Sequence, residues 1–270
     1  MAEKIALLGC GFMAGAIAKG LIEKNVIPAE NIIAINGHNP ASAENFASKY
    51  GTSFGSAEAV AEADAVITCF KPQSYKTAMP EYARHMHAGQ LLISIMAGLT
   101  TRDIKSLLPE GVDVIRTMPN MALAVGLSAT GYSPAGASAE HKALCEKIFG
   151  SLGIISEVPE EDLTGVTAIA GSSPAYFYYL AESMIKAAVA AGMDENAAKM
   201  LCKQAFIGTA ELWKNDDAPP EEMRRRITSA KGTTDAAIRT MEAGGLADIV
   251  ADGMKACCER FVEMGIEMMK

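Results

Sequence analysis

Short apolar runs alternate with amphipathic segments along the first 158 residues of the chain. The clearest runs are Ile5–Leu8, Ile32–Ile35, Ala65–Cys69, Leu91–Ile95 and Val112–Met118. Runs of this length between helical segments are typical of parallel strands whose two faces are both covered by helices. The alternation therefore predicts βαβ units, and with them an α/β domain built on a parallel sheet.

The pattern changes after about residue 158, because no further strand-like run follows. Pro174–Ala191 and Glu195–Trp213 are predicted helices, and a third carries apolar residues every three or four positions from Leu246 to Met268. Such a stripe is more often core than a partner surface, but in a small domain it commonly packs against a second subunit. The chain is thus predicted to have an α/β domain over residues 1–158 and an all-helical domain over 159–270.

Charge and composition exclude several classes of protein. The formal net charge of the 270 residues is −8, which leaves no basic face for nucleic acid or for an anionic membrane. No apolar run reaches the roughly 18 residues expected of a membrane span, and no secretory signal is visible. The six cysteines form no C-x-x-C pair, so we expect reduced thiols, a cytoplasmic protein and no metal site.

A glycine-rich loop follows the first predicted strand and opens the first predicted helix. Gly9, Gly11 and Ala14 fit the pattern G-x-G-x-x-G/A in the context that dinucleotide binding requires. The first glycine permits a tight turn, the second lets a pyrophosphate approach the backbone, and the small Ala14 lets helix and strand pack closely. The alternative is a glycine-rich packing turn. We therefore predict a Rossmann-like dinucleotide-binding domain.

The segment after the second strand bears on the choice of cofactor. An NAD-binding domain usually carries an acidic residue there, whereas this chain reads Asn36-Gly37-His38-Asn39. Neutral donors and a protonatable His38 suit a 2′-phosphate better, so NADPH is the expected cofactor, with NADH as an alternative. His38 as a plain surface residue is the competing interpretation. Later strand ends, at Lys71-Pro72, Ala97-Gly98 and Met118-Pro119-Asn120, are also polar or small, as a cofactor lying across a sheet edge requires.

The stretch Ile227–Thr234 places four hydroxyls and Gly232 just before a predicted helix that starts near Asp235. A helix start offers unpaired N–H groups and a partial positive charge. Hydroxyls and a glycine at that point suit a small anion such as a carboxylate. A simple N-cap loop is the alternative, because Ser and Thr are common caps. A neighbouring cofactor domain favours the anion site, since a substrate must be held beside the nicotinamide.

In the order of its motifs the whole chain resembles the pyrroline-5-carboxylate reductase family. That resemblance implies an N-terminal Rossmann domain and a helical domain that dimerises through interlocking helices, often in larger rings, with the active site between the nucleotide domain and the helical dimer. The segments that carry it are the glycine loop with Met13-Ala14, Lys71-Pro72-Gln73, Ala97-Gly98-Leu99, Arg116 with Met118-Pro119-Asn120, Gly171–Tyr176 and Thr228–Thr234.

Site residues follow from the resemblance, position by position. Ser229 and Thr234 match residues that hold the substrate carboxylate and ring nitrogen, and Gly232 and Thr233 match backbone donors to that carboxylate. Thr234 is the catalytic candidate, as the hydrogen-bond partner of the ring nitrogen. The positions that match the surroundings of NAD(P)H are Gly9, Gly11, Phe12, Met13, Asn36, Ser56, Lys71, Pro72, Ala97 and Asn120.

The implied reaction is NAD(P)H-dependent reduction of 1-pyrroline-5-carboxylate to L-proline, the last step of proline biosynthesis. Hydride adds to the imine carbon, and the nitrogen becomes a protonated amine. Because such imines are partly protonated near neutral pH, no strong general acid is required, and positioning can supply most of the rate.

The chain departs from the family pattern at several positions near the site. Phe12 stands where Asn is usual, Ser173 where Gly is usual, Ala230-Lys231 where Pro-Gly is usual, and Met121-Ala122 where Thr-Pro is common. Two alternatives therefore remain: a reductase of another small cyclic imine or carboxylate, and a non-catalytic NADP-binding paralogue.

Overall fold

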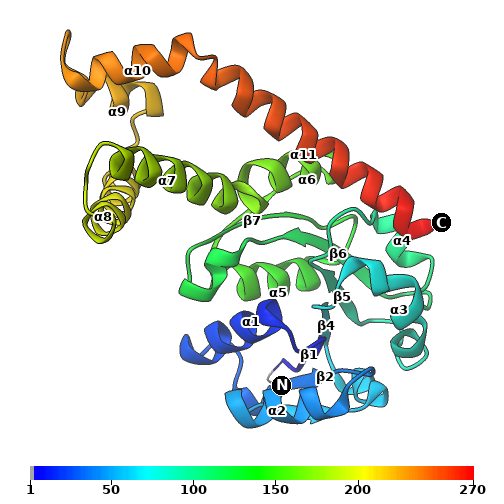
Figure 1. The fold of residues 1–270 in the computed structure, drawn as a ribbon. Helices are drawn as coiled ribbons and strands as arrows, with labels where there is room; N and C mark the ends of the chain where they lie inside the picture. Colours follow the sequence, from blue (N-terminus) through cyan, green and yellow to red (C-terminus); the bar gives the residue numbers. More distant parts are fainter. Residues whose placement is uncertain (1–2) are drawn as a thin grey trace. The chain divides into compact units, whose positions relative to one another are not determined.

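The computed structural model describes residues 3–270, which form two compact units. The first unit contains the described residues up to Ser172 together with Ala256–Lys270, and the second contains Ser173–Lys255 (Figure 1). The last strand ends at Glu157. The predicted domain limits, 1–158 and 159–270, therefore coincide with the end of the sheet. The compact units divide the chain at other residues, so the predicted limits stay a prediction.

A single eight-stranded sheet forms the centre of the first unit, in the order β3-β2-β1-β4-β5-β6-β7-β8. Strands β1 to β6 are all parallel, β7 runs antiparallel to β6, and β8 is parallel to β7. The strands are β1 (Ile5–Leu8), β2 (Ile32–Ile35), β3 (Ser53–Gly55), β4 (Ala65–Thr68), β5 (Leu91–Ser94), β6 (Asp113–Met118), β7 (Ser128–Ser133) and β8 (Gly153–Glu157).

Helices cover both faces of this sheet, as the apolar runs predict. On one face α1, α2 and α5 pack over Ile5 and Leu7, and on the other α3 and α4 pack over Ala6 and Leu8 (Figure 1). These helices are α1 (Phe12–Glu23), α2 (Pro40–Tyr50), α3 (Tyr75–Ala83), α4 (Thr101–Lys105) and α5 (Ala139–Gly150). The short helices are η1 (Ala29–Asn31), η2 (Ala57–Glu62), η3 (Pro72–Ser74), η4 (Met121–Val125), η5 (Glu160–Asp162), α6 (Leu163–Val166) and the π-helix η6 (Thr167–Gly171).

The second unit is entirely helical and has almost no core of its own. Ala198 is its only buried residue, whereas Tyr178 and Tyr179 are 78% and 72% exposed. Helices α7 and α8 pack against each other. Its helices are α7 (Ser173–Ala190), α8 (Glu195–Lys214), α9 (Pro220–Arg226), α10 (Thr233–Ala243) and the first part of α11 (Leu246–Met269). Across residues 3–270, none of the helices has the length and apolarity needed to cross a membrane.

The predicted fold class is confirmed, with an N-terminal Rossmann-like domain followed by helices. Three strands at the two edges of the sheet were not predicted, β3 at one edge and β7 and β8 at the other, because their sequences are polar or glycine-containing. The antiparallel direction of β7 follows from its connection to β6: only residues 119–127 separate the two strands. A parallel crossover needs a dozen or more residues, so this short connection can only return antiparallel.

The end of α11 belongs to the first unit and is attached there by two glycines. A Cβ on Gly265 would lie 2.1 Å from the carbonyl oxygen of Gly98, and Gly98 itself has φ +89°. Met268 and Met269 pack against the core cluster that contains α3 and α4. The backbone of α11 therefore touches the loop after β5 directly, which any side chain at position 265 would prevent.

Gly265→Ala is expected to destabilise the first unit by about 2 kcal/mol or more, because helix and loop must separate to admit the methyl group. Urea unfolding followed by circular dichroism measures this loss. Gly253→Ala, on the same helix, is the matched control. No atom lies within 4 Å of its added Cβ, and alanine favours a helix over glycine by roughly 0.5–1 kcal/mol. Equal effects of the two substitutions would contradict the close contact.

Candidate functional site

All of the predicted cofactor residues lie at one edge of the sheet. They follow the carboxyl ends of β1 (Gly9, Gly11, Phe12 and Met13), β2 (Asn36), β3 (Ser56), β4 (Lys71 and Pro72), β5 (Ala97) and β6 (Asn120). Because these six strands are parallel, their carboxyl ends share one edge. The strand order reverses between β1 and β4, which is where doubly wound sheets open a crevice for ligands.

The glycine loop has the geometry that a pyrophosphate requires. Gly9 has φ +105°, and a Cβ there would lie 2.9 Å from the backbone nitrogen of Phe70. Gly11 differs: a Cβ there would meet no atom within 4 Å, so its surface is open. Gly11 is also the N-cap of α1, with no side-chain cap and no acidic residue in the first turn. Free N–H groups and a positive helix end thus face an open backbone surface, which fits a dinucleotide phosphate.

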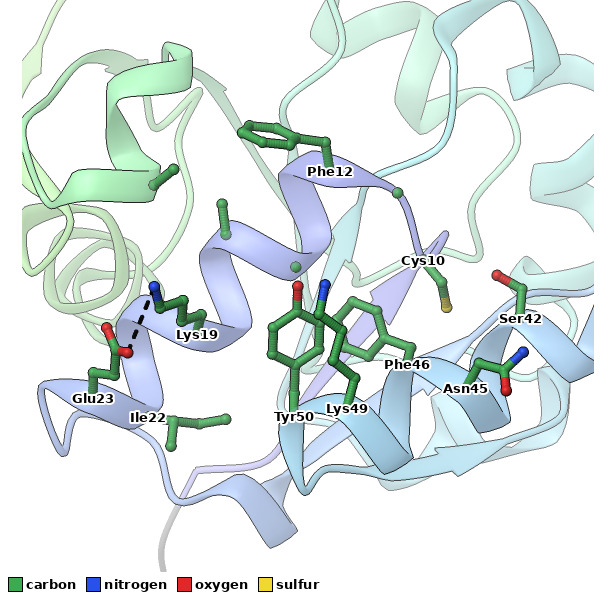
Figure 2. A pocket seen from close by; sticks show the side chains of 14 residues that line it. Cys10, Phe12, Lys19, Ile22, Glu23, Ser42, Asn45, Phe46, Lys49 and Tyr50 are labelled. Atoms are coloured by element: carbon green, nitrogen blue, oxygen red, sulfur yellow. Dashed lines mark ion pairs between the residues drawn. The ribbon is translucent and has the colours of Figure 1, made fainter.

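A groove of about 940 Å³ runs between α1 and α2, beside this loop (Figure 2). Ser42, Asn45 and Tyr50 line it from α2. Its two lysines are already engaged, since Lys19 lies 3.7 Å from Glu23 and Lys49 lies over the ring of Tyr50. Of the predicted cofactor residues, Gly11 and Phe12 line this groove and the others do not. The groove therefore borders the glycine loop at Gly11 and Phe12 and does not extend along the other strand ends.

The segment after β2 is held by a residue that the sequence did not single out. The N–H of Gly37 donates to the hydroxyl of Tyr82 at 3.1 Å, and the Tyr82 ring stacks on Phe70 with centroids 6.3 Å apart. Burial raises the pKa of Tyr82 above its ordinary value. Asn39 caps α2 by accepting from the N–H of Ser42. A tyrosine in the helix after β4 carries no recognisable motif, so only the structure reveals this contact.

Asn120 is engaged with the protein on every side. It is 9% exposed, its Oδ1 accepts from the N–H of Ala122 at 3.0 Å, and its Nδ2 donates to the carbonyl of Ala170 at 3.1 Å. Its own N–H donates to the hydroxyl of Ser128. Asn120 thus ties the end of β6 to η4, β7 and the π-helix η6.

An ion pair between a buried arginine and a partly exposed glutamate supports two neighbouring strand ends. Arg116, on β6, is 2% exposed and donates to Glu160 at 2.9 Å, and the same carboxylate oxygen accepts from the N–H of Thr101 at 2.6 Å. Burial disfavours the charge on Glu160, but these two hydrogen bonds outweigh it, so the pKa of Glu160 lies below its usual range. The pair joins β6 to the start of α4, three residues after Gly98.

The predicted substrate residues lie together on the loop before α10, in the helical unit. Gly232 is the N-cap of α10 with no side-chain cap, and its N–H donates to the carbonyl of Ser229 at 2.9 Å. A Cβ on Gly232 would lie 2.5 Å from the Ser229 hydroxyl, so the Ser229 side chain packs directly against Gly232. Thr233 and Thr234 form the first turn of α10 and are exposed. Thr228 is occupied elsewhere, since its hydroxyl donates to the carbonyl of Arg224.

Comparison with known proteins bears on both units. Residues 160–264 match the family model for pyrroline-5-carboxylate reductase dimerisation, and residues 4–98 match one described as NADP oxidoreductase, coenzyme F420-dependent. The chain is 30% identical to pyrroline-5-carboxylate reductase 1 of Bacillus spizizenii over 99% of its own length and 91% of the relative's. The chain belongs to the pyrroline-5-carboxylate reductase family.

Solved structures of two reductases have the same fold along nearly the whole chain. The pyrroline-5-carboxylate reductase of Coxiella burnetii has a TM-score of 0.89 at 28% identity and covers 98% of this chain and 99% of its own. The pyrroline carboxylate reductase of Plasmodium falciparum, solved with NADP bound, has a TM-score of 0.86 at 27% identity and covers 97% and 98%. The family is thus one of NAD(P)-binding oxidoreductases.

The departures from the usual reductase pattern are visible as local features of this member of the family. Phe12 and Met121 are exposed apolar side chains, 59% and 60% accessible, at the starts of α1 and η4. Ser173 begins α7. Lys231 holds a left-handed backbone conformation, φ +61°, at a position where the family usually has glycine.

Two alanine substitutions in the glycine loop of this reductase should separate folding from cofactor binding. Gly9→Ala is expected to cost about 2 kcal/mol of stability, because of its positive φ and the contact with Phe70. Gly11→Ala should leave the unfolding free energy nearly unchanged but weaken NADPH binding about tenfold or more, since the methyl group occupies the phosphate surface. Thermal unfolding and fluorescence titration with NADPH measure the two effects. Unchanged NADPH affinity in Gly11→Ala would refute the assigned pyrophosphate position.

Removing Glu160 should leave Arg116 as a buried, unpaired charge. We expect Glu160→Ala to cost about 2–3 kcal/mol, discounted because this carboxylate is one-third exposed. The double variant Arg116→Met with Glu160→Ala should lose less stability than Glu160→Ala alone.

The contribution of Glu160 to stability should depend on pH, because the pKa of Glu160 is lower in the folded protein than in the unfolded chain. This contribution is complete above the unfolded pKa near 4.3, and it is lost as the pH falls through the folded pKa. Urea unfolding of the wild type, Glu160→Ala and the double variant at pH 7 and pH 3.5 tests both predictions. A double variant less stable than Glu160→Ala would contradict the prediction of an unpaired buried charge.

Proposed function

We propose that this protein is a pyrroline-5-carboxylate reductase that reduces 1-pyrroline-5-carboxylate to L-proline with NADPH. The observation that carries the proposal is the pairing of two features in one full-length member of the family. These are a dinucleotide loop whose backbone is open at Gly11 and an uncapped helix start at Gly232 with hydroxyls beside it.

The residues of the nucleotide unit support a specific assignment of roles. Gly9, Gly11, Phe12 and Met13 carry the pyrophosphate at the start of α1. Lys71 is exposed and forms no ion pair with any described residue, so its charge is available to a phosphate. When bound, NADPH supplies the hydride.

The preference for NADPH rests on the segment after β2. No carboxylate lies between Asn36 and Asn39, and the Asn39 side chain is used as a helix cap. Asn36 and His38 are then the side chains left to meet a ribose 2′-phosphate, which an acidic residue would repel. NADH is expected to support slower turnover. Ser56, Pro72 and Ala97 complete the cofactor surroundings along the strand ends.

The second unit supplies the residues that hold the imine. Ser229, Gly232 and Thr233 offer a hydroxyl and N–H groups to the carboxylate at the positive end of α10. The hydroxyl of Thr234 forms a hydrogen bond with the ring nitrogen of the substrate. The rest of the rate acceleration comes from orienting the iminium carbon toward the hydride donor. No side chain is required as a strong acid, because the imine is itself basic.

The helical unit also supports self-association. Ala198 is the only buried residue between Ser173 and Lys255, and large apolar side chains are exposed along α7, α8 and α11. Together with the match to the dimerisation family model, this supports a homodimer or a ring of dimers. We also expect a small-molecule substrate, no nucleic-acid or membrane partner, and a cytoplasmic location.

The direct test mixes the purified protein with NADPH and pyrroline-5-carboxylate while the absorbance of the reduced nicotinamide is followed. Rapid oxidation of NADPH is expected, and Thr234→Ala should lower kcat at least about tenfold, while Thr234→Ser should restore most of it. Turnover only with another cyclic imine or a keto acid would support a related reductase. Cofactor binding without turnover across such a panel would support a non-catalytic paralogue.

A further inference from the structure

Lys231 places a cation within the loop that we assign to the substrate carboxylate. It directly precedes Gly232, the N-cap of α10, and lies two residues after Ser229. Its side chain is exposed, and its backbone has φ +61°, a conformation that glycine adopts more easily than lysine. A lysine at this point therefore has a conformational cost that a glycine would avoid.

Most other cations of the helical unit are already neutralised. Lys231 and Lys203, by contrast, form no ion pair with any described residue. Ion pairs with carboxylates hold Lys186, Lys199, Lys214, Arg224, Arg225, Arg226 and Arg239. Lys203 lies on α8, away in sequence from the α10 loop. Lys231 is thus the uncompensated cation of the loop.

The acidic residue nearest in the loop does not cancel this charge. Asp235 accepts from the N–H of Lys231 at 3.1 Å and pairs with Arg239 at 2.8 Å. Its charge is therefore balanced by Arg239, while its hydrogen bond holds the Lys231 backbone in the left-handed conformation. The start of α10 keeps a net formal charge of +1 from Lys231, in a protein whose overall charge is −8.

An anion at this loop would meet three attractive groups from adjacent residues. Ser229 has its hydroxyl close to Gly232, as the 2.5 Å approach to a Gly232 Cβ shows. The uncapped N–H groups of α10 add a partial positive charge. The flexible four-carbon stem of Lys231 starts one residue away, so its ammonium can reach the same anion.

We propose that Lys231 is a specificity-determining residue that strengthens binding of cyclic imines bearing a carboxylate. The inference rests on the proposed function, because it assigns the loop to the carboxylate of the imine. Lys231 contributes to substrate binding and not to hydride transfer. Ser229 and the start of α10 already favour binding of pyrroline-5-carboxylate over 1-pyrroline, an analogue without the carboxylate. Lys231 increases this preference.

The test compares steady-state kinetics of the full-length protein and three variants at low ionic strength. Lys231→Gly removes the charge and adopts the left-handed backbone freely, so it should fold normally. We expect its KM for pyrroline-5-carboxylate to rise about three- to five-fold with kcat and the KM for NADPH unchanged, the size of an exposed charge interaction. Lys231→Arg should retain a KM close to wild type. Lys203→Gln, the matched control on α8, should leave all constants unchanged.

Salt and substrate charge supply two further readouts. The difference between wild type and Lys231→Gly should shrink at about 0.5 M salt, because screening weakens exposed charges. The KM for 1-pyrroline should not differ between them. An unchanged KM for pyrroline-5-carboxylate in Lys231→Gly, with active wild-type enzyme, would overturn this inference alone. A wild-type protein inactive with pyrroline-5-carboxylate would instead overturn the proposed function.

Discussion

The nucleotide unit depends on the parallel pairing of β1 with β2 on one side and with β4 on the other. This pairing makes the strand order reverse at β1, so β1 and β4 lead to helices on opposite faces of the sheet. Gly9 lies at that point: its N–H donates to the carbonyl of Ile35, and Cys69 donates to Leu8. The backbones approach so closely there that a Cβ on Gly9 would meet Phe70. The tight turn of the glycine loop is therefore a consequence of how the central strands pair.

The helical unit, in contrast, buries almost none of its side chains. Between Ser173 and Lys255 only Ala198 is buried, so these helices gain little from the hydrophobic effect within one chain. Apolar faces of this extent need another surface to cover them, in line with the match to a dimerisation family model. The loop before α10, which we propose for the substrate, is held locally, by Asp235 and by the tight turn at Gly232, and so keeps its geometry without a large core.

Much of this arrangement was predictable, because it depends on local periodicity. The strand Ile32–Ile35 and the helices beginning near Phe12, Pro40, Ser173 and Glu195 lie where the apolar pattern places them, within one residue. The strand β7 was missed because its polar residues are buried through mutual hydrogen bonds, such as Ser128 with Thr130, and not by apolar alternation. Tyr82 and the Arg116–Glu160 pair were missed for a similar reason: their partners lie 44 or more residues away in the sequence.

Local sequence patterns were enough to predict the fold class, the strands β1, β2, β4, β5 and β6, the family and the residues proposed for each ligand. Periodicity, glycine spacing and motif order carry that information, and they are properties of short segments. Which of these residues keep free polar groups, and which are hydrogen-bonded or ion-paired, depended on the folded chain. Asn120 proved to be surrounded by protein donors and acceptors, Gly11 remained open, and Lys231 remained unpaired in a strained backbone. The reason is that hydrogen bonds and ion pairs are satisfied by neighbours in space, and sheet and helix packing bring those neighbours from distant parts of the chain.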